Sequence, residues 1–126
     1  MIGVTVDGAA WMRNFKTATK KSEKQAKTAF RKAAKGLYNK IVSYTPVGDP
    51  SLWKWPAHAD YVPGKLKESW TIEESTSEII IKNDQPYAYR IEYGSWSTQA
   101  PYGMMRRAVF SFPSLLRAAT INNGDD

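Results

Sequence analysis

Apolar residues recur every three or four positions between Ala10 and Tyr44, and this regularity constrains the fold more than any other feature of the chain. Such spacing lines one face of a helix, and Ala, Lys, Gln and Leu, which are frequent here, lose little rotamer freedom in a helix. Asp7 can cap the first turn, and Pro46 ends the helix because the residue before proline disfavours helical geometry. The apolar face consists of Trp11, Phe15, Ala18, Ser22, Ala26, Ala29, Phe30, Ala33, Leu37 and Ile41.

One uninterrupted helix over residues 10–44 would span roughly 52 Å, which is longer than a domain of this size is wide. We therefore expect part of the helix to project from the domain or to lie along a neighbouring subunit. Ser22 and Gly36 are its weak positions, because serine buries little surface and glycine costs about 1 kcal/mol relative to alanine. A kink or break at either residue is the alternative.

The same helix carries most of the positive charge, with ten basic residues against the single acid Glu23, and the rest of the chain is net negative. Two interpretations stay open, contact with DNA phosphates or a solvated helix face. Base-specific recognition is not expected, because no recognition helix follows a short turn and lysine outnumbers arginine on this helix. The residues that would face DNA are Lys20, Lys24, Lys27, Arg31 and Lys35.

Composition bounds the remaining possibilities. The 126 residues form one domain with one modest core, and the absence of cysteine excludes disulfides and thiolate chemistry. No apolar run has the length of a membrane span, and residues 1–10 lack a signal-peptide pattern, so we expect a soluble protein that is made in a cytoplasm and has no membrane partner.

The fold predicted for residues 1–126 is α+β, a long N-terminal helix packed on a small antiparallel sheet, with a C-terminal helix. Residues 1–9 form either a short edge strand or a loose arm, and residues 45–65 form a proline-rich loop. Residues 66–83 form a hairpin, with strands at Leu66–Glu74 and Glu78–Asn83. A hairpin is not stable alone, so a third strand is needed from residues 1–6, from the loop or from another subunit.

Residues 86–121 are predicted to be helical. Pro86 suits the start of a short helix over 87–93, and Gly94 suits its left-handed end. From Gly103 onward the apolar residues again step at helical spacing. Pro113 lies inside this last helix and is expected to kink it or to start a new segment.

No arrangement of residues indicates catalysis or a cofactor. His58 is the only histidine, and a metal site would need partners that a chain without cysteine or a second histidine does not offer. Glu73 and Glu74 are adjacent, but on a strand they point to opposite faces. We therefore expect no catalytic residue, no metal, no cofactor and no enzyme.

Large aromatic residues are frequent in the two predicted loops. They either fold back to complete a small core or anchor an interface, and we favour the interface because aromatic residues are enriched among interface anchors. The candidates are Trp53, Trp55, Tyr61, Trp96 and Tyr102, with Trp53 and Trp55 foremost.

Several short motifs follow one another along the chain. The first are Thr45-Pro46-Val47 and the run from Gly64 to Trp70, which includes Leu66 and Ser69. The later ones are Asn83, Pro86-Tyr87-Ala88, Ile91-Glu92-Tyr93-Gly94 and the run from Gln99 to Arg106. Taken in order, these motifs resemble those of a family of bacteriophage neck and tail-completion proteins that includes the lambda minor tail protein Z group. The stretch 48–61 departs from the family, which often has a short turn there.

The resemblance implies a structural virion protein with a long helix on a small sheet, located at the head–tail junction after assembly in the host cytoplasm. Its partners would be further copies of itself in a ring, the neighbouring head-completion and tail proteins, and the genomic DNA in the channel. The resemblance also implies a signature loop that is shaped by Glu92, Tyr93, Gly94, Pro101, Gly103 and Arg106.

Overall fold

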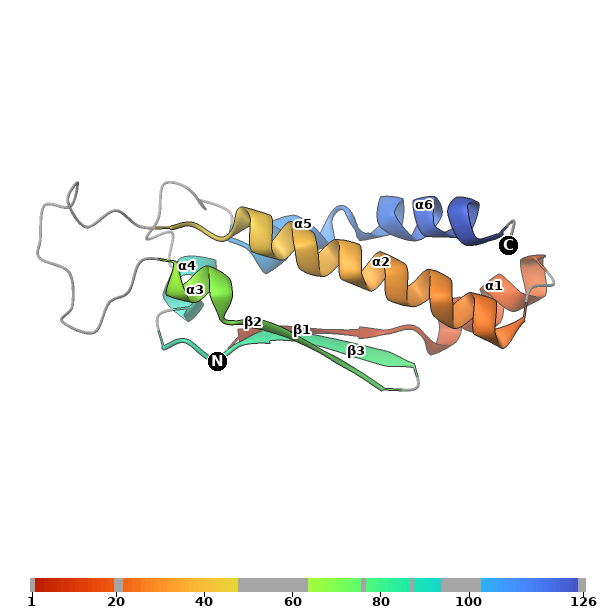
Figure 1. The fold of residues 1–126 in the computed structure, drawn as a ribbon, viewed down its shortest axis with the longest axis horizontal. Helices are drawn as coiled ribbons and strands as arrows, with labels where there is room; N and C mark the ends of the chain where they lie inside the picture. The colour runs from red at the N-terminus through yellow and green to blue at the C-terminus, as the bar shows by residue number, and fades with distance from the viewer. Residues whose placement is uncertain are drawn as a thin grey trace, which may run out of the picture.

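The computed structural model describes residues 2–19, 22–47, 64–75, 77–86, 88–93 and 103–124 (Figure 1). The elements in chain order are β1 (Ile2–Asp7), α1 (Ala9–Thr19), α2 (Glu23–Tyr44), α3 (Lys65–Glu68), β2 (Trp70–Glu74), β3 (Glu78–Asn83), α4 (Ala88–Tyr93), α5 (Met105–Val109) and α6 (Phe112–Gly124). The α2 helix runs along the length of the molecule, with the three-stranded sheet on one side and α5 and α6 on the other. The predicted α+β class, a long helix on a small antiparallel sheet with a C-terminal helix, is confirmed.

The predicted continuous helix over residues 10–44 is wrong in one respect, because α1 and α2 are separate helices. The break lies at Ser22, one of the two weak positions, while α2 continues through Gly36. The Ser22 hydroxyl accepts a hydrogen bond from the backbone N–H of Gln25 at 3.2 Å, and the Gln25 side chain accepts one from the Ser22 N–H at 2.9 Å. This reciprocal capping box satisfies two donors at the start of α2 and fixes its first turn.

The α1 helix packs against α2, so the two helices do not form the projecting rod that one long helix would give. The Asp7 carboxylate accepts a hydrogen bond from the N–H of Ala9 at 3.0 Å, as expected of a residue at a helix start. Phe15 is buried, and the ring of Trp11 lies 6.2 Å from that of Phe30 on α2. Glycine at position 8 allows the backbone between β1 and α1 to approach Phe30 closely, because a side chain there would come within 2.5 Å of the Phe30 ring.

The third strand of the sheet comes from the N-terminus, which settles the choice between a strand and a loose arm. The order is β1-β3-β2, and both pairings are antiparallel. Ile79 and Ile81 of β3 are buried beneath α2, and Val4 and Val6 of β1 lie beside them in register. Because side chains alternate along a strand, one face of the sheet forms the core with α2 and the other stays open.

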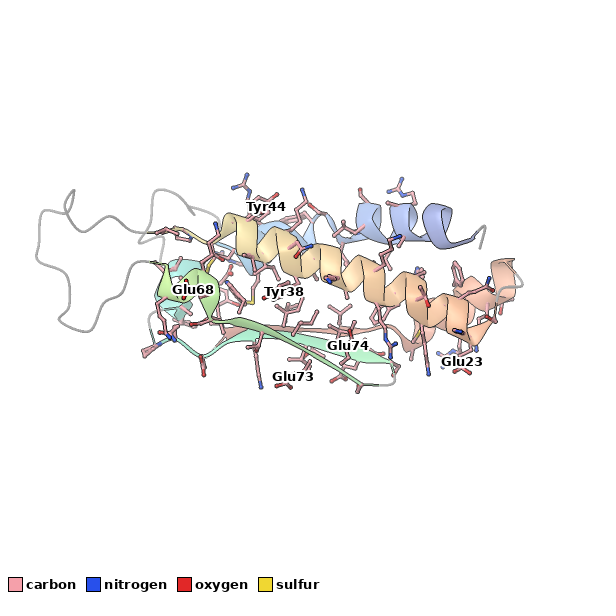
Figure 2. The ribbon with its side chains drawn as sticks, in the orientation of Figure 1. Glu23, Tyr38, Tyr44, Glu68, Glu73 and Glu74 are labelled. Carbon is pink, nitrogen blue, oxygen red and sulfur yellow. The ribbon has the colours of Figure 1, made fainter. Side chains whose placement is uncertain are left out.

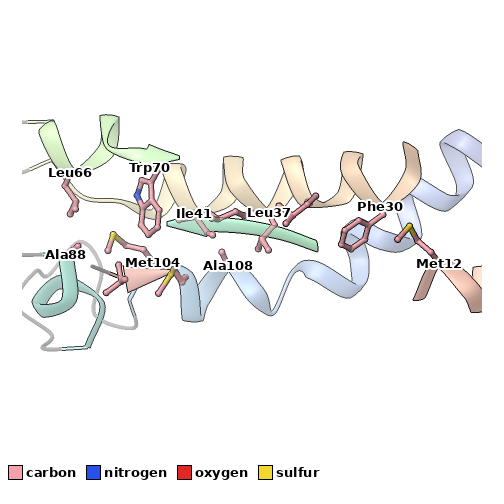
Figure 3. Packing of buried hydrophobic residues seen from close by; sticks show 14 of the residues in the cluster. Met12, Phe30, Leu37, Ile41, Leu66, Trp70, Ala88, Met104 and Ala108 are labelled. Carbon is pink, nitrogen blue, oxygen red and sulfur yellow. The ribbon is translucent and has the colours of Figure 1, made fainter. Parts of the chain in front are cut away.

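The first strand of the hairpin begins later than predicted. Residues Lys65–Glu68 form the short helix α3, and β2 starts at Trp70 instead of Leu66. Leu66 and Trp70 are both buried in the main core (Figure 3). The Trp70 indole N–H donates to the Thr45 hydroxyl at 2.8 Å, and that hydroxyl donates to the backbone oxygen of Ile41 at 2.8 Å.

The C-terminal helical part consists of two helices. Pro113 lies in the first turn of α6, where its missing N–H costs little, so it starts a new segment as one of the two expectations had it. The α6 helix packs along small residues of α2, and a side chain at Gly36 would come within 3.0 Å of Leu115. In the described part of the chain, no helix is long and apolar enough to cross a membrane.

Candidate assembly surfaces

A buried carboxylate links α4 to α5. Glu92 is fully buried, and its Oε1 accepts hydrogen bonds from the backbone N–H groups of Met104 at 3.0 Å and Met105 at 2.6 Å. Its Oε2 accepts from Arg106, from the backbone N–H at 3.3 Å and from Nε at 2.9 Å. Nη2 of Arg106 donates to the Glu92 backbone oxygen as well. We call Glu92, Gly103, Met104, Met105 and Arg106 the Glu92 cluster.

The start of α5 explains why a carboxylate is needed there. Its N-cap residue, Met104, offers no side-chain hydrogen bond, so the first N–H groups of the helix need an acceptor from elsewhere. Glu92 supplies that acceptor from α4, and its negative charge also suits the positive end of the helix. Arg106 neutralises the charge, and a buried carboxylate is tolerated only when it is paired and hydrogen-bonded in this way.

Gly103 makes room for the carboxylate. Its φ is +85°, a conformation that glycine adopts without strain. A side chain at this position would collide with Oε2 of Glu92 and come within 2.7 Å of the Glu92 backbone oxygen. Glycine is therefore required here both by the backbone conformation and by the close approach of Glu92.

Two tyrosines lie on the surface next to this cluster. The rings of Tyr89 and Tyr93 are 5.0 Å apart, and the guanidinium of Arg106 lies 5.0 Å from the centre of the Tyr93 ring. Their exposed fractions are 61% for Tyr89 and 48% for Tyr93, large values for aromatic residues. We call Tyr89, Tyr93 and Arg106 the tyrosine patch. Tyrosine and arginine are typical anchors of protein interfaces, so the patch is a candidate contact surface.

The described part of the predicted signature loop comes together in space. Glu92, Gly103 and Arg106 form the centre of the cluster, and Tyr93 lies at its edge. Tyr89 was not among the predicted residues, although its spacing of four from Tyr93 on a short helix is a signal that would have placed the two rings together. The remaining predicted residues of the loop and the interface lie outside the described residues: Gly94, Pro101, Trp53, Trp55, Tyr61, Trp96 and Tyr102.

The predicted interface aromatics belong to segments 48–63 and 94–102, and the described residues that flank these segments lie at one end of the molecule. The C-terminal end of α2 and the start of α3 flank residues 48–63, and they lie beside α4 (Figure 1). The hydrogen bonds of Glu92 hold residues 104–106, which follow the second segment, next to α4. The tyrosine patch belongs to the same end.

The basic face of α2 forms the second candidate surface. Lys24, Arg31 and Lys35 of α2 are exposed and Lys27 is half-buried, and Arg31 reaches the edge strand β2. We call these four residues the basic stripe; Lys20, the fifth predicted member, lies outside the described residues. Arg31 forms an ion pair with Glu74 of β2, with 3.2 Å between Nε and Oε2, and Figure 2 shows where Glu74 lies on the sheet below α2.

In the part of the chain that the structure describes, no three His, Asp or Glu side chains come together as ligands for a metal ion. His58 lies outside that part. The described surfaces offer exposed tyrosine rings at one end and ammonium and guanidinium groups along α2.

Comparison with models of known protein families gives a match. A family model named HK97-gp10_like, with the description "Bacteriophage HK97-gp10, putative tail-component", matches residues 9–94, well over half of the chain. The matched region runs from α1 to the end of α4 and includes Glu92 and the basic stripe, whereas Gly103 and Arg106 follow it. No curated protein and no solved structure matches the chain.

Proposed function

Since the chain belongs to the HK97-gp10-like family of bacteriophage tail components, it is a structural protein of the phage tail, and we propose that identical copies form a ring at the head–tail junction and join head to tail. We also propose that the protein acts without catalysis, metal or cofactor. The match does not single out the lambda minor tail protein Z group, so that part of the resemblance stays a prediction.

The observation that carries the proposal is the hydrogen-bonded construction of the end that bears the tyrosine patch. A fully buried carboxylate with four hydrogen bonds fixes α4 relative to α5. This fixed base presents two exposed tyrosines, and it lies where the chain enters and leaves the segments that carry Trp53, Trp55 and Trp96. Pre-organised aromatic anchors on a rigid base favour a specific contact between proteins, because little conformational freedom is lost on binding.

A complementation experiment tests this function. Phage that lack the gene are supplied with the chain in the host, and the particles are imaged by electron microscopy. Without the chain we expect separate heads and tails or tails of abnormal end structure. The variant Tyr89→Ala/Tyr93→Ala should give the same defect although it folds, whereas Lys40→Ala, an exposed change on α2, should restore infectious particles.

Two results would contradict the proposal. One is normal infectious particles in the absence of the chain. The other is assembled particles in which immunogold labelling finds no copy of it at the end of the tail.

A second candidate function is that of a sequence-nonspecific DNA-binding accessory protein. The observation that favours it is the basic stripe, of which only Arg31 has an ion-pair partner among the described residues. Neutralised phosphates release counterions, so binding to any duplex should be measurable at low salt and should fall steeply as salt rises. Absence of binding at low salt would eliminate this candidate, and the same test on Lys24→Glu/Lys35→Glu would show whether the stripe is responsible.

A further inference from the structure

The sheet has one face that α2 does not cover. The side chains of this face alternate with the core residues along each strand, and α2 and α6 lie on the other side of the sheet (Figure 1). The residues that it carries on the outer strands β1 and β2 are exposed, whereas those on the central strand β3 are half-buried. We call it the open face, and its residues are Gly3, Thr5, Asp7, Thr71, Glu73, Glu78, Ile80 and Lys82.

The open face carries excess negative charge at the hairpin end. Glu73 is neutralised by Lys82, with 2.7 Å between Oε1 and Nζ. Asp7 and Glu78 lie directly opposite each other on β1 and β3, and neither has an ion-pair partner among the described residues. Like charges directly opposite on neighbouring strands destabilise a sheet. Asp7 also caps the start of α1, and cations from a neighbouring molecule would offset its repulsion with Glu78.

The basic stripe has the opposite imbalance. Lys24, Lys27 and Lys35 form no ion pair in the described part of the chain, and they lie along about three turns of one helix with Glu23 as the one acid beside them. Within one copy Arg31 reaches Glu74 at the β2 edge of the sheet, but the three lysines of the stripe form no ion pair with Asp7 or Glu78 of the open face. Between two copies these charges are complementary when the stripe of one meets the open face of the other, whereas stripe against stripe and face against face both bring like charges together.

We propose that copies of this chain associate head to tail, with the basic stripe of one copy packed on the open face of the next. This inference rests on the proposed ring and identifies the surfaces that form it. A heterologous contact of this kind leaves a free stripe at one end and a free open face at the other, so it repeats until rotation closes the ring. In the closed ring each stripe is covered by a neighbour and is not available to DNA.

Cysteine cross-linking tests the geometry directly, because the natural chain has no cysteine. Thr5 lies on the open face, and Thr28, which donates to the Lys24 backbone oxygen, is exposed on α2 between Lys24 and Arg31. Under mild oxidation the double variant Thr5→Cys/Thr28→Cys should give a ladder of linked species. A mixture of the two single variants should give only the mixed dimer. Dimers of either single variant alone, or no cross-link in the mixture, would overturn the proposal.

Charge reversal tests the energetics by sedimentation of the purified full chain at low salt. We expect the wild-type chain to self-associate, and Lys24→Glu or Glu78→Lys alone to weaken association at least about tenfold, because each brings like charges together at the contact. A mixture of the two variants should associate again. Lys40→Glu, the same charge change outside the stripe, should behave as wild type.

The outcomes separate this inference from the function on which it rests. A wild-type chain that stays monomeric at low salt overturns the inference. A Lys24→Glu variant that loses binding to duplex DNA but keeps self-association also overturns it, because the stripe then binds DNA and does not form the contact between copies. Neither result affects a tail-end location seen by microscopy. Conversely, absence of the chain from particles overturns the proposed function, while the cross-links in solution do not depend on any particle.

Discussion

The Glu92 cluster and the basic stripe differ in whether their charged groups are buried and paired. In the cluster one carboxylate is fully buried, and four donors from a single short stretch satisfy it. In the stripe most of the charged groups face solvent, and three of the four have no ion-pair partner among the described residues. The difference indicates that the cluster determines how the chain folds, whereas the stripe is available to something outside it. Stability measurements and association measurements should therefore respond to changes in different regions.

The largest effect on stability should come from Glu92→Ala. Removing the buried carboxylate leaves the first N–H groups of α5 without an acceptor and opens a cavity, while the half-exposed Arg106 keeps its contact with solvent, so we expect a loss of about 2–4 kcal/mol. Chemical denaturation of the purified chain measures the loss. Glu68→Ala removes an exposed carboxylate and serves as the control. A loss of less than about 1 kcal/mol for Glu92→Ala would show that the cluster is not a structural centre.

Gly103→Ala should come next, and Gly64→Ala is its matched control. Both glycines have φ near +85°, but a side chain at Gly64 would meet no atom within 4 Å, whereas one at Gly103 would strike Glu92. Both variants should lose the roughly 1–2 kcal/mol that a left-handed conformation costs other residues. Only Gly103→Ala should lose more, and equal losses would contradict the close packing of Glu92.

Arg31→Ala should have a small effect. Its ion pair with Glu74 is about half exposed, with side-chain exposures of 53% and 46%, and such pairs contribute about 0–1 kcal/mol. The thermal midpoint at low and at high salt measures the contribution of the ion pair to stability, and high salt should remove this contribution by screening. A loss comparable to that of Glu92→Ala would erase the distinction between the two regions.

The smallest effect on stability should come from Lys24→Glu/Lys35→Glu. Surface substitutions away from buried networks usually change the free energy of unfolding by less than about 0.5 kcal/mol. The same variant should nevertheless change association, which sedimentation at low salt detects. Marked unfolding of this variant would show that the stripe also serves the fold.

The sequence predicts the α+β class, the apolar face of α2, the strand Glu78–Asn83 and the short helix before residue 94, because each depends on local periodicity and on proline. The break at Ser22 is also predictable from sequence, since Ser22 and Gln25 have the spacing of a capping box. The helical turn Lys65–Glu68 is not predicted, because the strand that begins at Trp70 is extended four residues too far toward the N-terminus.

The candidate surfaces are less accessible to sequence reasoning. The resemblance groups Glu92, Gly103 and Arg106, but residues eleven to fourteen positions apart show their contact only once α5 is placed against α4. The opposition of Asp7 and Glu78 depends on which strand pairs with β3, and the sequence leaves three sources for that strand. Local sequence patterns predict the helices and strands, whereas the order and pairing of these elements determine which charged residues on different elements come close together.

The hydrogen bond between the Trp70 indole and the Thr45 hydroxyl has a further consequence for the segment that connects α2 to α3. These residues lie on either side of segment 48–63 and are held together by the folded body, not by the chain that connects them. The free-energy cost of closing a loop between two fixed points depends only weakly on the length of the loop, and each doubling of the length costs only about 0.6 kcal/mol. This position can therefore accept insertions and exchanged sequences over evolution, and an epitope tag introduced there should be tolerated by the rest of the molecule.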